Sequence, residues 1–213
     1  MTRRSRAAVH AGRLFSARLT LMRIVLILAV LLVLLFALGH DAMAKPPARD
    51  KRPPLSTKAE IDLARYMGRW WVIANIPYFA EKGKVESADV YALRADGRID
   101  NTFVYRKDFD HAVKDMKGLA EVVPGTNNAQ WRIAFLGGLV KVDYLVLEVA
   151  PDYSWALIGH PKRKLGWIFA REQDMGDEQY QLLLAKMEGY GYDTTQFRRV
   201  PQKAEQQGQP GFQ

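Results

Sequence analysis

The chain has 213 residues, 48% of them hydrophobic and 11% aromatic, which suits one globular domain with additional segments rather than a disordered chain. It contains no cysteine, which excludes disulfide bonds, thiolate metal sites and a cysteine nucleophile. The net charge of +8 lies largely in residues 1–44, which hold six arginines and one acidic residue. The other 25 basic and 22 acidic residues nearly balance, so the charge indicates no nucleic-acid partner.

Residues 1–44 have the features of an export signal. An arginine-rich stretch precedes an apolar run of fifteen residues that begins at Ile24, and Ala-Met-Ala at residues 42–44 fits a signal-peptidase site. Fifteen apolar residues are fewer than the roughly 20 that span a bilayer. A cleaved signal peptide is the first interpretation, and an uncleaved N-terminal membrane anchor is the second, because the arginine-rich stretch is long. Both place the domain outside the cytoplasm, in the periplasm or the cell envelope.

The rest of the chain divides into a spacer, a domain and a tail. Residues 45–60 contain four prolines and no apolar periodicity, so we expect an extended, solvated spacer. The folded domain is expected over residues 61–200. Residues 201–213 form a polar tail that we expect to be frayed.

Within the domain, short strand-like runs alternate with turn residues. The expected strands cover residues 69–76, 88–93, 99–106, 117–123, 130–136, 142–149, 154–159 and 166–171. Asp96-Gly97, after the second run, is typical of a hairpin turn. Eight strands joined mostly by hairpins predict an all-β fold, an antiparallel up-and-down barrel that can hold one small ligand. An open sandwich is the alternative.

One helix is predicted after the last strand. Apolar residues recur at helical spacing at Tyr180, Leu183, Leu184 and Met187. Asp177 is the expected cap, and Gly189 is expected to end the helix. We expect its apolar face to pack against the outside of the barrel.

Three short motifs in these strands resemble those of the lipocalins. They are Gly68-x-Trp70 at the start of the first strand, Asp152-Tyr153 at the turn before the seventh, and Arg171 at the end of the eighth. The resemblance covers roughly residues 61–200 and is greatest to the bacterial outer-membrane and temperature-induced lipocalins, the group that includes apolipoprotein D. It implies that Trp70 and Arg171 stack at the closed end of the barrel as structural residues. Such a cation–π pair is worth about 1–2 kcal/mol.

Strand parity, counted from an inward-facing Trp70, predicts the lining of the barrel. Together with the loop after the first strand, it gives the expected ligand-binding residues Ala74, Ile76, Tyr78, Phe79, Asn101, Phe103, Tyr105, Ile133, Phe135, Tyr144, Val146, Trp167 and Phe169. This lining is apolar and aromatic with few polar groups, which suits an amphiphile with a long apolar portion. The alternative is that inward aromatics simply fill the barrel. The resemblance to lipocalins favours a pocket.

The loops at the open end of the barrel carry two further features. Pro77, Tyr78 and Phe79 form an apolar lip, and residues 162–164 place three basic side chains in one turn. One interpretation is that these side chains pack on neighbouring loops or are solvated. The other is contact with lipid head groups or an anionic membrane surface.

No nucleophile elbow, phosphate loop, dinucleotide fingerprint or metal-ligand spacing occurs, and no cofactor is expected. The sequence therefore predicts a non-enzymatic, exported carrier of a fatty acid or lysophospholipid that serves lipid transport or maintenance in the envelope. A structural or stress-related envelope protein with a filled barrel is one alternative. A carrier of a tetrapyrrole or isoprenoid is another. The sequence pattern does not determine the oligomeric state.

Overall fold

The computed structural model describes residues 52–213, which form one compact unit, Arg52–Gln213; the predicted leader lies outside the described residues. The strands are β1 (Gly68–Asn75), β2 (Val85–Leu93), β3 (Ile99–Arg106), β4 (Lys114–Val122), β5 (Gln130–Phe135), β6 (Val140–Val149), β7 (Trp155–Gly159), β8 (Gly166–Ala170) and β9 (Arg198–Arg199). The α-helices are α2 (Leu63–Tyr66) and α3 (Asp177–Gly189), and the 3-10 turns are η1 (Leu136–Gly138), η2 (Thr194–Gln196) and η3 (Ala204–Gln206). No helix within this part of the chain is long and apolar enough to cross a bilayer.

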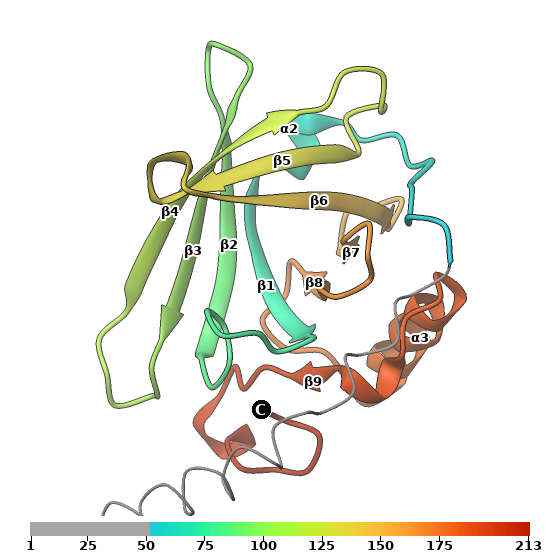
Figure 1. The fold of residues 1–213 in the computed structure, drawn as a ribbon. Coiled ribbons are helices and arrows are strands. Elements are labelled where there is room, and N and C mark those ends of the chain that lie inside the picture. Colours follow the sequence, from blue (N-terminus) through green and yellow to red (C-terminus); the bar gives the residue numbers. More distant parts are fainter. Residues whose placement is uncertain (1–51) are drawn as a thin grey trace, which may run out of the picture. The chain divides into compact units, whose positions relative to one another are not determined.

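Strands β1 to β8 close into an antiparallel up-and-down barrel (Figure 1). Each strand pairs with the next along the chain, and β1 also pairs with β8, so the sheet returns on itself. This confirms the predicted all-β barrel with one helix after it. The short strand β9 was not predicted, and it pairs with the end of β1 at Ala74 and Asn75.

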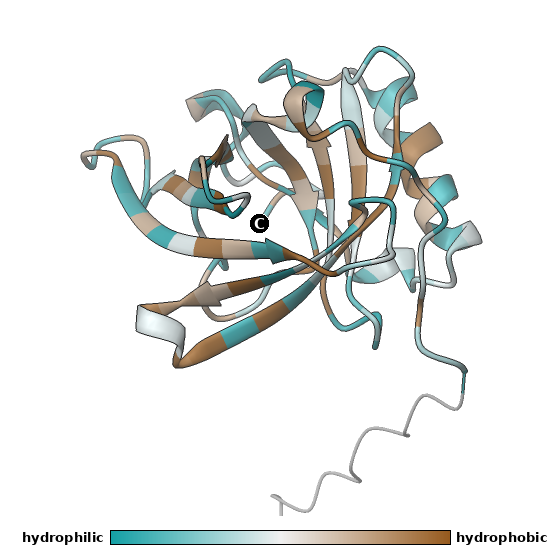
Figure 2. Ribbon diagram, turned by 90° about the horizontal axis from the view of Figure 1, so that it is seen from above, coloured by the Kyte–Doolittle hydropathy of each residue, from teal (hydrophilic) through white to brown (hydrophobic). Residues whose placement is uncertain are grey.

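Two apolar cores stabilise the unit, one inside the barrel and one between the barrel and α3. The inner core contains Trp70, Ile99 and Trp131 among others. The outer core joins barrel residues such as Leu157 to Leu183 and other residues of α3. Apolar and polar residues alternate along several strands, as a sheet with two differently covered faces requires (Figure 2). Every strand pairing and both cores that the structure describes lie within Arg52–Gln213, so a protein that contains this unit keeps all of them.

The start of α3 differs from the prediction. The N-cap is Gly176, which has an extended backbone conformation and, as a glycine, no side chain that could cap the helix. Asp177, the predicted cap, is instead the first helical residue. The carboxylate of Asp177 still lies in the first turn, where the helix dipole favours an acid.

The predicted inward positions Ala74 and Ile76 belong to the outer core instead. The reason is an irregularity in β1: Val72 pairs with Phe169, but Ala74 pairs with the adjacent Ile168, so two steps on β1 match one on β8. After such a bulge, each following residue of the strand faces the side of the sheet opposite to the one that simple alternation predicts. Asn75, rather than its neighbours, therefore turns toward the open end of the barrel interior.

Both flanking segments contact the barrel. In the predicted spacer, Leu55 donates its backbone N–H to Pro161 O at 2.8 Å, and Thr57 Oγ1 donates to Val146 O at 2.6 Å. In the tail, Gln202 is buried and its Nε2 donates to Val72 O at 2.8 Å. The expectation of a frayed tail was wrong, because a polar composition does not reveal that these amides pair with strand carbonyls.

Candidate ligand-binding site

Trp70 and Arg171 hold the closed end of the barrel. The guanidinium of Arg171 lies over the fully buried indole of Trp70, with Cζ 3.8 Å from the ring centroid. It also donates to the backbone oxygens of Arg69 at 2.8 Å and Arg65 at 2.7 Å. Gly68 has a φ of 95°, and a Cβ there would lie 3.3 Å from Arg171 Nη1, so glycine makes room for the guanidinium. The stacking of Trp70 and Arg171 is thus present, and the structural role that the lipocalin motifs imply for these residues stays a prediction.

The turn between β6 and β7 fixes α2 across the same end. Asp152 Oδ1 accepts hydrogen bonds from the backbone N–H of Ser154 at 3.0 Å and its hydroxyl at 2.7 Å, which hold the pKa of Asp152 below its usual range. Tyr153 has a φ of 63°, and its hydroxyl accepts the backbone N–H of Asp62 at 3.0 Å. The guanidinium of Arg65 lies 4.1 Å from the Tyr153 ring centroid. The second motif thus anchors the helical turn that covers the barrel floor.

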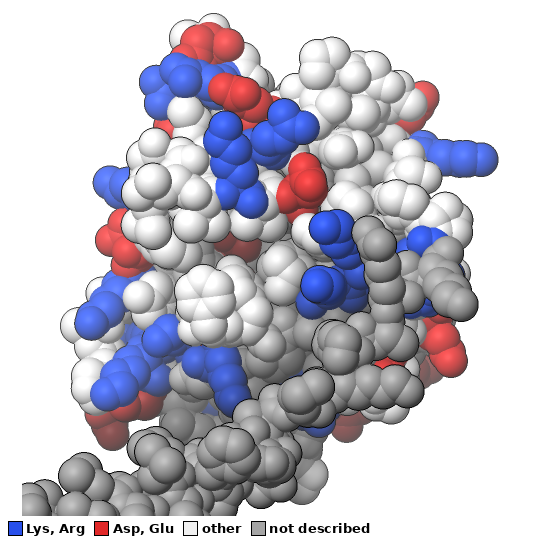
Figure 3. Space-filling model, viewed as in Figure 1, with Lys and Arg blue, Asp and Glu red and all other residues white. Residues whose placement is uncertain are grey.

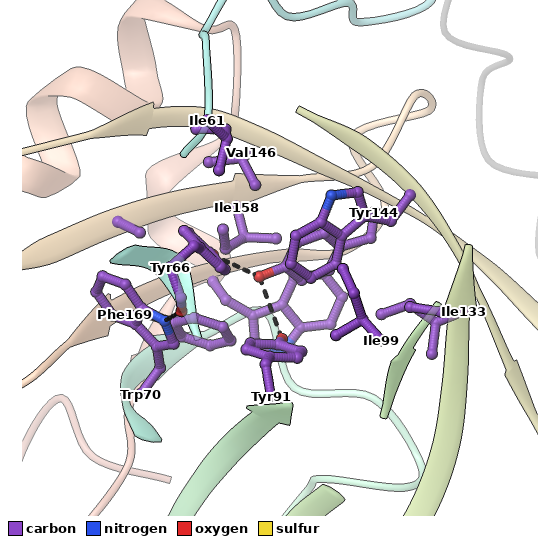
Figure 4. Packing of buried hydrophobic residues seen from close by; sticks show 14 of the residues in the cluster. Ile61, Tyr66, Trp70, Tyr91, Ile99, Ile133, Tyr144, Val146, Ile158 and Phe169 are labelled. Atoms are coloured by element: carbon purple, nitrogen blue, oxygen red, sulfur yellow. Dashed lines mark hydrogen bonds between the residues drawn. The ribbon is translucent and has the colours of Figure 1, made fainter. Parts of the chain in front are cut away.

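Five buried aromatic residues fill the closed end of the barrel, and we call them the aromatic plug: Tyr66, Trp70, Tyr91, Trp131 and Tyr144. Figure 4 labels all of them except Trp131. The Tyr66 and Tyr144 hydroxyls are 2.7 Å apart, and Tyr91 donates to Tyr144 at 3.1 Å. Trp131 stacks on Tyr144 with ring centroids 5.1 Å apart. Burial raises the pKa of all three tyrosines, so they stay neutral and the hydroxyl bonds persist.

A cavity of about 40 Å³ lies between the aromatic plug and the open end. Its lining consists of Tyr78, Glu81, Asp89, Tyr91, Asn101, Phe103, Met116, Ile133, Phe135, Val142, Tyr144, Trp167 and Phe169. Gly118 on β4 makes room for one wall, because a Cβ there would lie 2.7 Å from the Phe135 ring. The cavity is apolar over most of its wall and polar where the β1–β2 loop meets β2 and β3.

Eight of the thirteen predicted ligand-binding residues line this cavity: Tyr78, Asn101, Phe103, Ile133, Phe135, Tyr144, Trp167 and Phe169. Five do not. Ala74 and Ile76 lie in the outer core because of the bulge, and Val146 is buried in the inner core away from the cavity. Tyr105 stacks on its neighbour two residues earlier, and Phe79 is 91% exposed. The binding of a ligand by the eight remains a prediction.

Sequence reasoning missed Glu81, Asp89, Tyr91, Met116 and Val142. Asp89 and Tyr91 could have been found by extending the parity count to β2, since Asp89 pairs with Trp70 on one side and with Phe103 on the other. A carboxylate in a barrel wall did not suggest an inward position. Glu81 lies in the β1–β2 loop, where no period applies.

Glu81 is buried at the mouth of the cavity with a 6% exposed surface. Its carboxylate accepts hydrogen bonds from the amide of Asn75 and from Trp167 Nε1, the latter at 2.9 Å. Burial raises its pKa, while these donors and Tyr78 lower it in part. The residue ties the β1–β2 loop to β1 and β8.

Asp89 lies deeper on the same wall, with part of its surface open to the cavity. Burial, and to a smaller extent the charge of Glu81, raises the pKa of Asp89 to about 7, and the amide of Asn101, which donates to Asp89 Oδ1 at 2.9 Å, counteracts this. No Lys, Arg or His within residues 52–213 pairs with either carboxyl. The polar wall is therefore acidic and lacks a cation.

Exposed apolar side chains gather on the loops of the open end. Phe79, Leu136 and Leu139 are 91%, 64% and 88% exposed. Of the predicted basic turn, Lys162 and Lys164 are exposed, but Arg163 Nε donates to Tyr190 O at 2.9 Å and so faces the helix side. On the face shown in Figure 3, basic side chains lie in separate groups with acidic ones among them.

Glu148 is two residues after Val146 on β6, where ideal strand alternation would turn it inward, but it lies outside the barrel. Its Oε1 accepts a hydrogen bond from Lys186 Nζ of α3 at 2.6 Å, after a register shift between β6 and β7. In the described part of the chain, no three His, Cys, Asp or Glu side chains gather in a way that could hold a metal ion.

The comparisons with known proteins agree with this architecture. A family model described as a lipocalin-like domain matches residues 61–202. The chain is 33% identical over 151 residues to temperature-induced lipocalin-1 of Arabidopsis thaliana, covering 67% of this chain and 80% of that protein. It is 29% identical over 144 residues to the outer membrane lipoprotein Blc of Escherichia coli K12, covering 66% and 79%.

Solved structures show the same fold at low sequence identity. Lobster apocrustacyanin A1 superimposes with a TM-score of 0.54 at 16% identity, covering 76% of this chain and 95% of that one. Insecticyanin from the tobacco hornworm Manduca sexta gives a TM-score of 0.54 at 18% identity, covering 73% and 86%. Motifs, closed barrel and family match agree: the chain belongs to the lipocalin family.

Proposed function

We propose that this lipocalin is an exported carrier that binds a fatty acid or lysophospholipid at the open end of its barrel and serves lipid handling in the cell envelope. Lipocalins bind small hydrophobic ligands and are generally binding and transport proteins rather than enzymes. The observation that carries the proposal is the cavity, in which aromatic and aliphatic side chains surround one polar wall. The Blc relatives are named as outer membrane lipoproteins, which supports an envelope location here.

The cavity volume sets a condition on this proposal. About 40 Å³ holds one or two water molecules, whereas drug-sized ligands occupy roughly 300 Å³ or more. An acyl chain therefore requires the side chains at the mouth to move. Tyr78 packs edge-on against Trp167, with centroids 6.4 Å apart, and its neighbour Phe79 is almost fully exposed. Phe79 has little packing to lose when this loop moves, whereas the hydrogen bonds from Asn75 and Trp167 to Glu81 in the same loop would have to rearrange.

The small volume also favours a second candidate function. If the mouth does not open, the aromatic plug and the side chains above it fill the barrel, and the protein acts as a structural or stress-related envelope component. Lipid uptake distinguishes the two functions directly.

The replacement Val142→Trp should fill the cavity and weaken lipid uptake at least tenfold. Val142 is half-buried and lines the cavity on β6, so an indole there takes the ligand's place. The measurement is titration of residues 45–213 with a fluorescent fatty acid and a fluorescent lysophospholipid, together with native mass spectrometry of any lipid that co-purifies. Lys141→Trp, at the exposed neighbouring position, is the matched control. Failure of the wild-type protein to bind either probe would refute the carrier function and favour the filled barrel.

We further propose that the open end contacts an anionic membrane surface during lipid exchange. Because the chain has no cysteine, a single cysteine can be introduced and labelled with an environment-sensitive fluorophore. At Phe79 or Leu139 the label should shift to shorter wavelength when vesicles containing about a quarter anionic lipid are added. Leu182→Cys on α3, where the native side chain is 53% exposed, should show no shift. Equal shifts at all three positions, or none, would contradict the proposed contact.

A further inference from the structure

Among the described residues, the cavity wall presents hydrogen-bond acceptors and no cationic side chain. Asn101 is only 1% exposed, and its Nδ2 is used by Asp89. Its Oδ1 is buried without a hydrogen-bond partner. The amide cannot gain by reversing, because its oxygen would then face the Asp89 carboxylate. A buried acceptor without a donor costs about 1–3 kcal/mol, so this atom is suited to a donor from outside the protein.

Asp89 adds a second acceptor beside the first. One hydrogen bond, from Asn101, reaches its carboxyl among the described residues, and a carboxylate can accept about four. Glu81 is different, since Asn75, Trp167 and Tyr78 supply donors to it. The incomplete acceptors are therefore Asp89 and Asn101, side by side on neighbouring strands and both lining the cavity.

We propose that Asp89 and Asn101 form a subsite for an ammonium head group, so that the preferred ligand is an amphiphile with a protonated amine and an apolar tail. This rests on the proposed function, because it assumes that the cavity takes a hydrophobic ligand. An ammonium brings three N–H donors and no acceptor, which matches the partnerless Asn101 Oδ1 and the Asp89 carboxylate with its single hydrogen bond. Its charge also offsets that of a carboxylate that no basic side chain among the cavity's described lining residues accompanies.

Of the two ligand classes proposed above, the same wall disfavours fatty acids, which end in a carboxylate, and favours lysophospholipids whose head group carries an amine. A fatty-acid anion would bring acceptors toward Asp89, Asn101 and Glu81, and like charges placed together in a poorly solvated site repel strongly. The apolar walls, formed by residues such as Phe103 and Phe169, do not discriminate between head groups. Head-group selectivity therefore comes from this one wall.

The preference should depend on pH. The titratable groups that face Asp89 are Glu81 and Tyr78 of the β1–β2 loop, Tyr66 of α2, Tyr91 on its own strand and Tyr144 of β6. The tyrosines stay neutral because burial raises their pKa. Asp89, with a pKa of about 7, ionises between pH 6 and 8. The attraction for an ammonium should grow over that interval.

Three probes with one tail test the inference: decylammonium, decanol and decanoate, titrated calorimetrically into residues 45–213, which contain the whole compact unit. At pH 8 we expect decylammonium to bind at least tenfold more tightly than decanoate, with decanol between them. At pH 6 the ratio should shrink several-fold. Asp89→Asn should bring the ratio near one at both pH values, whereas Asp115→Asn, which removes an exposed carboxylate on β4, should leave it unchanged.

The outcomes separate the two proposals. Binding of none of the three probes refutes the carrier function and the subsite together. Binding of decanol with decanoate equal to or tighter than decylammonium refutes the subsite alone. The pH dependence of the wild-type protein needs no variant, so the inference remains testable even if Asp89→Asn fails to fold.

Discussion

Replacing Arg171 with alanine is expected to lower the free energy of unfolding by about 3 kcal/mol. The change removes the cation over the Trp70 ring, worth about 1–2 kcal/mol, and the bonds to the backbone oxygens of Arg65 and Arg69. The Arg65 oxygen lies in α2 and the Arg69 oxygen in β1, so loss of these hydrogen bonds loosens the attachment of α2 to the closed end of the barrel. Urea unfolding followed by tryptophan fluorescence measures the change.

Two variants sharpen this prediction. Arg171→Lys should recover less than half of the loss, because a single ammonium cannot both cover the indole and reach the separate carbonyls. Arg132→Ala removes an arginine that is 57% exposed and 3.9 Å from Asp143, and it should cost at most about 0.5 kcal/mol. If Arg171→Ala and Arg132→Ala have the same small effect, the closed end does not depend on the stacked pair.

Asp89→Asn is expected to flatten the dependence of stability on pH. The pKa of Asp89 in the folded protein is about 7, above its ordinary 3.8, so the folded state holds this proton more tightly than the unfolded state does. The free energy of unfolding that this proton binding contributes is present in full below pH 3.8 and is lost as the pH rises through 7. Between pH 5 and pH 8 the wild-type protein should lose about 2–3 kcal/mol through this group.

Glu81 also contributes to the pH dependence of wild-type stability, and its effect has the same direction as that of Asp89. Burial raises its pKa too, so both carboxyls destabilise the fold as the pH rises. Chemical denaturation at pH 5, 6, 7 and 8 should show a decline that is about 2 kcal/mol smaller in Asp89→Asn than in wild type. Asp115→Asn should follow the wild-type curve. A steep decline retained in Asp89→Asn would mean that Asp89 is already well solvated in the folded protein.

The strand order could be predicted from the sequence because each strand of an up-and-down barrel pairs with the next along the chain. The inward residues follow the two-residue alternation of a strand. Trp70 and Arg171 could be paired before the structure was known because their motifs carry the lipocalin resemblance. The period also placed Phe103, Ile133 and Trp167 at the cavity.

It failed where the backbone leaves the ideal ladder. The bulge after Val72 turns Ala74 and Ile76 to the outer side of the barrel, and no residue type in that apolar run indicates a bulge. The acidic wall was missed for a different reason. Hydrophobic patterning assigns Asp89 to solvent, and only the register against Trp70 and Phe103 shows that it faces inward. A polar residue that faces the interior of the barrel cannot be recognised from the hydrophobic pattern alone.

The closure of the sheet has a consequence for life in a crowded compartment. Each of the eight barrel strands has a hydrogen-bonded neighbour on both sides, so the barrel in residues 52–213 offers no free strand edge for another chain to extend; the short β9, which pairs with the end of β1, is the outermost strand of the sheet. Strand addition to the barrel itself would first require it to open between β1 and β8. In the described residues, the apolar surface most available for association is that of exposed side chains at the open end, such as Phe79 and Leu139. Barrel closure in residues 52–213 therefore disfavours polymerisation by strand addition, while the exposed apolar side chains at the open end remain available for other contacts.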